Sequence, residues 1–331
     1  MAKQETWTVV VTDFNYPDLS IEEAELARWD ARVVPAQCTT PEEVLAAGRD
    51  ADALISQYAP VTREVIQGLT RCKAIGRYGI GVDNIDVAAA TERGIAVVNV
   101  PSYCEDDVSD HAMAMLLAWA RKIPHYTEEI RRGTWDWKTG RPIHRLRGQV
   151  LGLLGFGKIA RLLARKAQAL GLRVIAHDPY LPEEVFSQAG VEQVKFDDLL
   201  SRSDFLSIHV PLTEGTRHLI DGEALAKMKP TACLINSSRG GVIHEEALIR
   251  ALQEGRIAGA CLDVTDPEPP DPENPLRKMP QVLLSPHVAW YSEESQIDLR
   301  RKIAQDVGRA LSGLLPHGLV NRELKDKFRP G

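Results

Sequence analysis

A single glycine turn constrains the fold of this chain more than any other part of its sequence. The stretch Gly155-Phe156-Gly157-Lys158-Ile159-Ala160 has the pattern G-x-G-x-x-A, follows the apolar run Val150 to Leu154 and precedes the helical run Arg161 to Leu170. A glycine turn between a buried strand and a helix is typical of the first βαβ unit of a parallel sheet that binds a dinucleotide. The turn therefore predicts an α/β chain.

The residue types in the turn suit a pyrophosphate. Gly155 permits the tight turn, and Gly157 lets the backbone approach the phosphates. The N-terminus of the following helix attracts their negative charge. We therefore expect the turn as a whole to contact a cofactor, through Gly155, Phe156, Gly157, Lys158 and Ile159.

The next predicted strand supplies a carboxylate for the ribose. It ends in Asp178, about twenty residues beyond the turn, where an acidic side chain accepts hydrogen bonds from the ribose hydroxyls. A carboxylate there repels the 2′-phosphate of NADP, and Pro179 rather than an arginine follows it. We predict that the cofactor is NAD, that NADH is preferred over NADPH, and that Asp178 and Pro179 belong to its site.

Short apolar runs alternate with helical stretches along the rest of the chain, which is the rhythm of parallel sheets. Before the turn the expected strands are Thr8 to Val11, Arg32 to Val34, Ala53 to Ser56, Ala74 to Gly76 and Ala96 to Val98. From the turn onward they are Val150 to Leu154, Arg173 to Ala176, Phe205 to Val210, Ala232 to Asn236, Ala258 to Val264 and Val282 to Ser285. Because 331 residues suggest two domains, these two sets predict two doubly wound parallel-sheet domains.

Three segments outside the strands have distinct signals. Ser102 and Glu105 have the spacing of a capping box, which would start a helix that continues through Val108 to Ala120. The stretch Arg131 to Arg147 follows no clean period, so we expect irregular structure there. A final helix is expected from Glu293 to Leu314.

Charge and composition exclude several classes of function. The net charge is −6 and like charges never form a long block, so we expect no nucleic-acid partner. The longest apolar stretch, Ala112 to Ala120, is about half of a membrane span, so no membrane contact is expected. Without a secretory signal, the expected location is the cytoplasm. Five widely spaced cysteines with no C-x-x-C pair argue against a disulfide framework and against a metal site.

Three consecutive predicted strands lead into residues that suit acid–base chemistry. In an open parallel sheet, ligands bind at the carboxyl ends of the strands, and there the sequence places Arg239, Glu268 and His287. Arg239 can bind a carboxylate and the adjacent carbonyl with its planar fork. His287 can protonate the alkoxide that hydride transfer creates, and Glu268 can orient its ring. These residues predict an NAD-dependent reductase of 2-oxo acids.

The chain resembles the D-isomer-specific 2-hydroxyacid dehydrogenases over nearly its whole length. The matching motifs are Gly76 to Asp86, the turn at Gly155, Asn236 to Gly241, Leu262-Asp263-Val264, Glu268-Pro269 and Pro286-His287. The resemblance implies reversible hydride transfer between NADH and C2 of a 2-oxo acid. It also implies a flavodoxin-like substrate domain, residues 1–103 plus 291–331, and a Rossmann NAD-binding domain, residues 104–290.

The resemblance also assigns further residues by their position. The backbone around Gly79 and Ile80 would bind the substrate carboxylate, and Arg77 with the adjacent Tyr78 would reach the substrate. Asp263 would accept the nicotinamide amide. The other implied cofactor contacts are Val210, Pro211, Thr216, Ser237, Ser238 and Ala289. Residues from about 104 to 147 would form the interface of a homodimer.

Within the family, the segments Pro286 to Ser292 and Asp178 to Tyr180 most resemble those of the C-terminal binding proteins, which are dehydrogenase-like corepressors. Trp290 is the most specific residue of this resemblance. In that branch the tryptophan packs over the substrate's side chain, which would suit an alkyl or thioether tail. Packing in the core or at an interface is the other interpretation of Trp290. His244 departs from the family pattern, because Asp usually stands there.

Two alternatives to a general D-2-hydroxyacid dehydrogenase stay open. The chain could be an NAD(H)-sensing, corepressor-like scaffold with weak dehydrogenase activity, or a phosphoglycerate dehydrogenase. Glyoxylate, hydroxypyruvate, phosphohydroxypyruvate and longer aliphatic 2-oxo acids are all compatible with Arg239 and the loop at Gly79.

Overall fold

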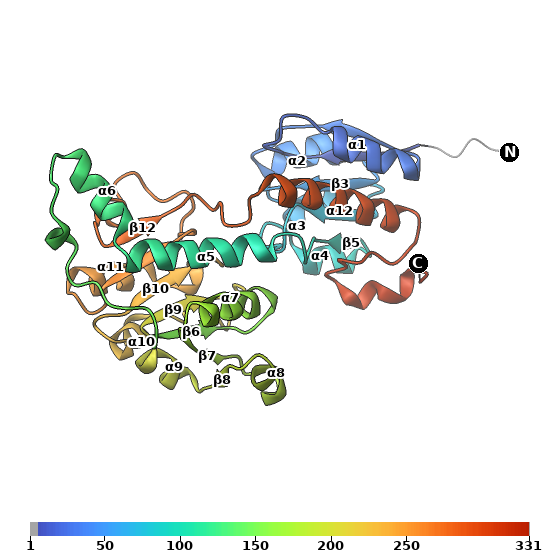
Figure 1. Cartoon of the computed structure of the whole chain (residues 1–331). Helices are drawn as coiled ribbons and strands as arrows, with labels where there is room; N and C mark the ends of the chain where they lie inside the picture. The colour runs from blue at the N-terminus through green and yellow to red at the C-terminus, as the bar shows by residue number, and fades with distance from the viewer. Residues whose placement is uncertain (1–5, 331) are drawn as a thin grey trace. The chain divides into compact units, whose positions relative to one another are not determined.

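The computed structural model describes residues 6–330, which divide into two compact units. Unit 1 contains the chain up to Tyr103 and again from Ser292 onward, and unit 2 is Cys104–Tyr291. Each unit is built on one sheet in which every pair of neighbouring strands is parallel. Figure 1 shows the elements by label. The predicted fold class, two doubly wound α/β domains, is confirmed.

The sheet of unit 1 has five strands in the order β2-β1-β3-β4-β5. Their bounds are β1 Trp7–Val11, β2 Ala31–Pro35, β3 Ala53–Ser56, β4 Ala74–Arg77 and β5 Ala96–Val98. This order, 2-1-3-4-5, is the flavodoxin-like arrangement that the sequence predicted.

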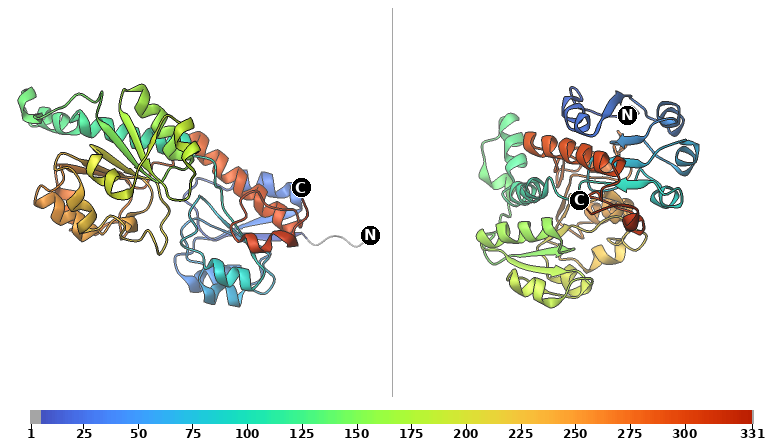
Figure 2. Two further views of the ribbon diagram at one scale, coloured as in Figure 1. Left: turned by 90° about the horizontal axis from the view of Figure 1, so that it is seen from below. Right: turned by 90° about the vertical axis from the view of Figure 1, so that its right-hand side faces the viewer.

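Helices line both faces of the unit 1 sheet, as the two further views show (Figure 2). One face packs on α2 (Pro41–Gly48), α3 (Arg63–Gly68) and α4 (Val87–Glu92). The other packs on α1 (Ser20–Leu26) and α12 (Glu293–Leu311). Gly76 of β4 faces α12 so closely that an added Cβ would lie 2.8 Å from Val307 Cγ2. The C-terminal helix is therefore part of the core of the N-terminal sheet.

The sheet of unit 2 has seven strands in the order β12-β11-β10-β9-β6-β7-β8. Their bounds are β6 Val150–Leu154, β7 Arg173–His177, β8 Glu192–Gln193, β9 Phe205–Ile208, β10 Cys233–Asn236, β11 Gly259–Leu262 and β12 Val282–Leu284. Counted from β6, the order is that of a Rossmann sheet with one further strand. The order in which successive strands are added reverses between β6 and β9, although all strands stay parallel. Ligands of such sheets bind at this switch point.

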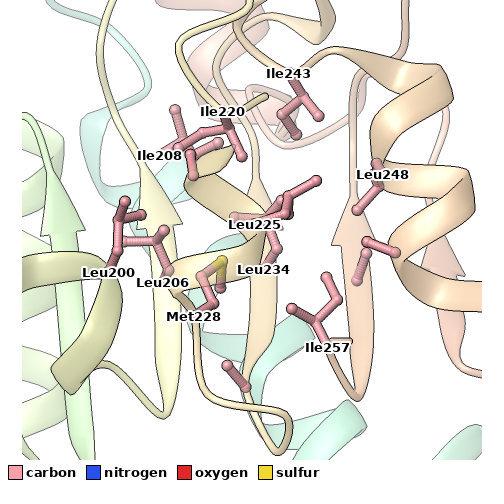
Figure 3. Packing of buried hydrophobic residues seen from close by; sticks show 14 of the residues in the cluster. Leu200, Leu206, Ile208, Ile220, Leu225, Met228, Leu234, Ile243, Leu248 and Ile257 are labelled. Carbon is pink, nitrogen blue, oxygen red and sulfur yellow. The ribbon is translucent and has the colours of Figure 1, made fainter. Parts of the chain in front are cut away.

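Alternate residues of the unit 2 strands face two separate cores. Leu206 and Ile208 of β9 pack with α9 (Phe196–Arg202), α10 (Gly222–Lys227) and α11 (Glu245–Gln253), in one buried cluster that also contains Leu225, Leu234 and Leu248 (Figure 3). Side chains on the opposite face pack with α5 (Glu105–Ala120), α7 (Lys158–Ala169) and α8 (Glu183–Gln188). Burial on both faces explains why these strands are continuous apolar runs.

The segment before β6 differs in part from the prediction. Helix α5 begins at Glu105 with Cys104 at its N-cap, so the capping box that we predicted with Ser102 at the N-cap is wrong. Helix α6 (Ile123–Arg131) follows, and the irregular stretch beyond it contains one 3-10 turn, Trp137–Gly140. The other 3-10 turns are Ala27–Trp29, Gly240–Val242, Pro275–Lys278 and Arg322–Lys327. Among residues 6–330, no helix is both long and apolar enough to cross a membrane.

Candidate active site

The glycine turn lies at the switch point of the unit 2 sheet. Gly155 directly follows β6 and has φ +86°, a left-handed conformation that favours glycine. An added Cβ would lie 2.9 Å from the carbonyl oxygen of His209 and 3.0 Å from Val210 Cγ1. Those two residues follow β9, the strand on the other side of the switch. Gly155 thus closes the turn against the neighbouring strand end.

Gly157 has the opposite surroundings. It is the N-cap of α7, its φ of −72° is open to any residue, and nothing lies within 4 Å of an added Cβ. Lys158 is exposed beside it, and Ile159 is half-buried. The Phe156 ring is buried and stacks on Phe186, with 4.8 Å between the centroids, so only its main chain faces the turn. Open space at Gly157, next to the N-terminus of a twelve-residue helix, fits a pyrophosphate.

The Asp178 carboxylate is held beside this space by two backbone amides. Asp178 Oδ2 accepts from Phe156 N (3.0 Å), and Oδ1 accepts from Tyr180 N (3.1 Å). The carboxylate therefore bridges the end of β7 and the glycine turn, where the ribose of a dinucleotide would lie. Pro179 and Tyr180 are exposed beyond it.

The loop after β9 is folded on itself around one hydroxyl. Thr216 Oγ1 donates to the Pro211 carbonyl (2.6 Å) and accepts from Thr213 N (2.8 Å). Val210 is half-buried, and its side chain lies next to Gly155. His209 was not predicted from the sequence. Its Nε2 pairs with Ser207 Oγ (2.9 Å), and burial lowers the pKa of its ring to about 4. A neutral His209 therefore supports the strand end beneath the predicted cofactor site.

The turn that carries Arg239 depends on the buried amide of Asn236, a residue of the matching motif to which the sequence assigned no role. Asn236 ends β10, donates from Nδ2 to the carbonyl of Arg239 (2.9 Å), and accepts at Oδ1 from Ser238 N (3.0 Å) and Ser238 Oγ (2.8 Å). The Arg239 guanidinium donates to the Ser238 carbonyl (2.8 Å), and Ser237 is half-buried at the start of the turn.

Gly240 joins this turn to the loop after β11. An added Cβ would lie 2.0 Å from the carbonyl oxygen of Thr265 and 2.7 Å from Asp266 N. That backbone contact requires a glycine, and it places the Arg239 turn next to the loop that leads to Glu268. His244 follows as the N-cap of α11, where its Nδ1 accepts from Ala247 N (3.4 Å). His244 thus fills the capping role for which the Asp more usual in the family is well suited.

The structure brings Glu268 and His287 into direct contact. His287 Nδ1 lies 2.7 Å from Glu268 Oε1, and both side chains are partly exposed. His287 has a left-handed backbone with φ 52°, which is uncommon for a residue other than glycine. Because β10, β11 and β12 are neighbours, Arg239 and the Glu268–His287 pair all lie at the carboxyl edge of one sheet.

Asp263 has a fully buried carboxylate beneath the His287 turn. It accepts from Val288 N and Ala289 N, each at 2.9 Å, and from Ser285 Oγ. Its predicted contact with the nicotinamide amide stays a prediction, since most of its acceptor capacity already serves the turn. Trp290 follows Ala289 and meets Tyr291 edge to face, with ring centroids 5.6 Å apart.

The predicted substrate loop belongs to unit 1. Arg77 ends β4, and its guanidinium folds over Gly79 and donates to the carbonyl of Tyr78 (2.6 Å). Tyr78 is buried, and its hydroxyl donates to Glu22 (2.9 Å), so only its main chain faces the loop. Ile80 is exposed, while Gly79 has φ +138°. In this loop the Arg77 guanidinium thus already donates to the main chain, and its role toward a substrate stays a prediction.

The described residues also bear on metal binding. Between residues 6 and 330, no group of three or more His, Cys, Asp or Glu side chains is placed to hold a metal ion.

Comparison with known proteins places unit 2 among dinucleotide-binding domains. Residues 113–289 match the family model of the NAD-binding domain of D-isomer specific 2-hydroxyacid dehydrogenases. The chain is 38% identical to a glyoxylate reductase of Korarchaeum cryptofilum over 94% of its own length and 93% of that protein. A D-lactate dehydrogenase from Aquifex aeolicus, solved with NAD and lactic acid, superposes with a TM-score of 0.83, 26% identity and coverage of 92% and 96%.

Another relative is longer than this chain. A D-3-phosphoglycerate dehydrogenase of Methanocaldococcus jannaschii is 44% identical over 85% of the chain, but the match spans only 54% of that protein. The chain thus covers about half the length of this relative.

Proposed function

Because the chain belongs to the family of D-isomer-specific 2-hydroxyacid dehydrogenases, we propose that it reduces a small 2-oxo acid to the D-2-hydroxy acid, reversibly. The observation that carries the proposal is the 2.7 Å contact between Glu268 and His287, at the same sheet edge as Arg239 and the glycine turn. A histidine held by a carboxylate beside a dinucleotide site is an acid–base group suited to such a reaction.

The roles of the catalytic residues follow from their contacts. NADH, when bound, supplies a hydride to C2 of the oxo acid. Arg239 binds the substrate carboxylate and polarises the carbonyl, which increases the positive character of C2. His287 gives its Nε2 proton to the carbonyl oxygen, since Nδ1 is held by Glu268. Glu268 stabilises the protonated ring and fixes its orientation. In the oxidation of the hydroxy acid, His287 takes the proton back.

NAD(H) fits the residues of unit 2. The open space at Gly157 and the N-terminus of α7 would hold the pyrophosphate, and Asp178 would hold the adenosine ribose. We assign further cofactor contacts to Val210, Pro211, Thr216, Ser237, Ser238 and Ala289. The fixed Asp178 carboxylate supports a preference for NADH over NADPH, because it would repel a 2′-phosphate.

The substrate contacts in unit 1 are proposed on the geometry of its loop. The main chain from Tyr78 to Ile80 and the guanidinium of Arg77 would bind the carboxylate end of the substrate. Trp290 would contact the substrate's side chain, which would favour an apolar tail over a small polar one. We therefore assign the loop from Arg77 to Ile80 of unit 1 to the substrate, and unit 2 to the cofactor, to the catalytic residues and to Trp290.

A homodimer is supported by the exposed aromatics beyond α6. Trp135 is 87% exposed and Trp137 is 63% exposed, which is unusual for side chains of this size. Ile123 and Ile130 on α6 are also exposed. A second copy covering residues from about 104 to 147 would bury them. The cytoplasmic location stays a prediction from the sequence.

Phosphoglycerate dehydrogenase is the second candidate, favoured by the 44% identity to the Methanocaldococcus jannaschii enzyme. Arg77 is the one cation that we place at the substrate loop, which is thin support for binding a phosphate. If the chain were instead a corepressor-like scaffold, we would expect NADH binding without substantial turnover of any oxo acid.

The His287→Gln variant tests the proposed chemistry. Gln keeps the polarity and approximate size of the side chain but cannot act as a proton donor near neutral pH. We expect turnover to fall by about 10² or more, because general acid catalysis typically contributes that much, while NADH binding, measured by fluorescence, stays within a few-fold of wild type. Turnover close to wild type would remove His287 from the proton transfer.

A further inference from the structure

A chain of polar side chains runs from helix α5 to the turn that carries His287. His111 of α5 has its Nε2 2.9 Å from Ser285 Oγ and 3.5 Å from Asp263 Oδ1. Ser285 Oγ donates to the same carboxylate oxygen of Asp263. All of these residues belong to unit 2, and Asp263 and Ser285 follow the neighbouring strands β11 and β12.

The hydrogen bonds of this chain have one possible direction. The ionised carboxylate of Asp263 can only accept, so Ser285 uses its single hydroxyl proton to donate to it. The Ser285 oxygen can then only accept from His111. His111 must therefore carry a proton on Nε2, and it is the terminal donor of the chain.

The acceptor end of the chain holds the backbone of the catalytic histidine. His287 N donates to the Asp263 carbonyl (2.8 Å), while Val288 N and Ala289 N donate to the Asp263 carboxylate (2.9 Å each). Three successive amides thus point to one residue. This arrangement stabilises the left-handed backbone of His287, whose φ of 52° is unfavourable for a residue with a Cβ.

The position of Asp263 is in turn fixed from the α5 side. Its carboxylate is fully buried and accepts from the hydroxyl of Ser285, which in turn contacts His111 Nε2. Without a donor at position 111, the Ser285 oxygen loses its partner, and the hydroxyl is free to turn away from Asp263. The carboxylate and the three amides could then shift together, and the ring of His287 would move with them.

We propose that His111 is a positioning residue for the proton transfer: through Ser285 and Asp263 it holds the backbone of His287 in the conformation that aims the imidazole. The proposal rests on the proposed function, because it concerns how His287 works in it. His111 itself does not touch the reacting atoms in this account.

Two substitutions of His111 separate its hydrogen bond from its bulk. In His111→Gln, the side-chain amide nitrogen can take the place of Nε2 and still donate to Ser285. In His111→Leu, a side chain of comparable size offers no donor. We expect His111→Leu to lower kcat by about ten- to a hundredfold, as is typical when the support of a catalytic group is lost, and His111→Gln to stay within about threefold of wild type.

The solvent isotope effect on kcat tells positioning from simple destabilisation. If the imidazole is misaligned, proton transfer becomes slower relative to the other steps, so the solvent isotope effect should rise in His111→Leu and not in His111→Gln. The KM for the oxo acid should change little in either variant. Equal loss of kcat in both variants, or loss in His111→Leu with an unchanged isotope effect, would overturn the proposal.

A spectroscopic measurement tests the chain of hydrogen bonds without any turnover. In wild-type protein with ¹⁵N-labelled histidine, the His111 ring, assigned by its loss in His111→Gln, should show a protonated Nε2. The His287 ring signals, assigned by their loss in His287→Gln, should shift in His111→Leu and not in His111→Gln. A His111 ring protonated on Nδ1 alone, or His287 signals that ignore both changes, would contradict the proposal. If wild-type protein reduced no oxo acid, the proposed function would fail, while these signals would still decide the role of His111.

Discussion

Three glycines of unit 2 offer one sharp prediction, because the structure assigns each a different reason for lacking a side chain. Gly148 has φ +88° and open space around an added Cβ, so a substitution there costs only backbone strain. Gly155 has nearly the same φ, +86°, but an added Cβ there would also lie 2.9 Å from the carbonyl oxygen of His209. Gly157 has an ordinary φ and open space. Alanine at the three positions therefore separates strain, packing and ligand space.

The expected losses of stability differ accordingly. Gly148→Ala should lower the free energy of unfolding by about 1–2 kcal/mol, the cost of a left-handed Cβ. Gly155→Ala adds a contact that forces the neighbouring strand end to move, for about 1–3 kcal/mol more. Gly157→Ala should change little, because fewer unfolded conformations stabilise by about 0.4–1 kcal/mol while the poorer N-cap costs a similar amount. Since about 1 kcal/mol corresponds to a shift of roughly 2–4 °C in a domain of this size, thermal unfolding resolves the order.

NADH binding should give a different order. Gly157→Ala places a methyl group in the space that we assign to the pyrophosphate, so the Kd for NADH should rise by about tenfold or more, or about 1.4 kcal/mol. Gly148→Ala should bind NADH as wild type does. Isothermal titration at a temperature well below every Tm measures this. Wild-type affinity in Gly157→Ala, or wild-type Tm in Gly155→Ala, would refute the assignment of the turn.

Three further predictions concern other residues. Asp178→Ser should reduce the discrimination between NADH and NADPH, measured as the ratio of kcat/KM; an unchanged ratio would show that the ribose is recognised elsewhere. The pKa of His209 is about 4 in the folded protein against 6.5 for an unperturbed side chain, so the unfolded chain binds the extra proton between these values. The free energy of unfolding should therefore fall as the pH drops from 6.5 to 4, by up to about 1.4 kcal/mol per pH unit from this group. In His209→Asn, the free energy of unfolding, measured by urea unfolding at several pH values, should depend less steeply on pH; the same pH dependence in both proteins would contradict a neutral His209 ring. His244→Ala should lower Tm, whereas His244→Asp should keep it at or above the wild-type value, because a carboxylate can accept from Ala247 N and alanine cannot; the same Tm in both variants would show that His244 does not act as the cap.

The sequence predicted the sheets well because both are buried on both faces. Ala53–Ser56, Ala96–Val98 and Val150–Leu154 have the predicted bounds, since each is an apolar run that ends at a turn or at a polar residue. Strand β8 (Glu192–Gln193) was missed because it has two exposed polar residues and no apolar signal. The strand predicted from Phe205 to Val210 is shorter in the structure, because the chain leaves the sheet at His209, where His209 and Val210 lie next to Gly155.

The candidate site was predictable only as far as motifs reach. Glu268 and His287 could be paired because both follow strand ends in a parallel sheet. The contact between the supporting residues His111 and Ser285 could not be predicted, because they are 174 positions apart and only the packing of α5 brings them together. The capping box at Ser102 failed for a related reason: the spacing was correct, but the helix begins at Glu105 with Cys104 as its N-cap. Local patterns predict elements, while hydrogen-bond networks depend on how those elements pack.

The most direct test of the account is NADH oxidation, followed by the loss of NADH absorbance, against a panel of 2-oxo acids. The panel runs from glyoxylate through hydroxypyruvate and phosphohydroxypyruvate to aliphatic oxo acids of increasing length, with chiral analysis of the product. We expect turnover of at least one member to the D-2-hydroxy acid, and a preference for long apolar tails would support a contact between Trp290 and the substrate. Tight NADH binding with negligible turnover across the whole panel, or an L-hydroxy acid as the product, would contradict it.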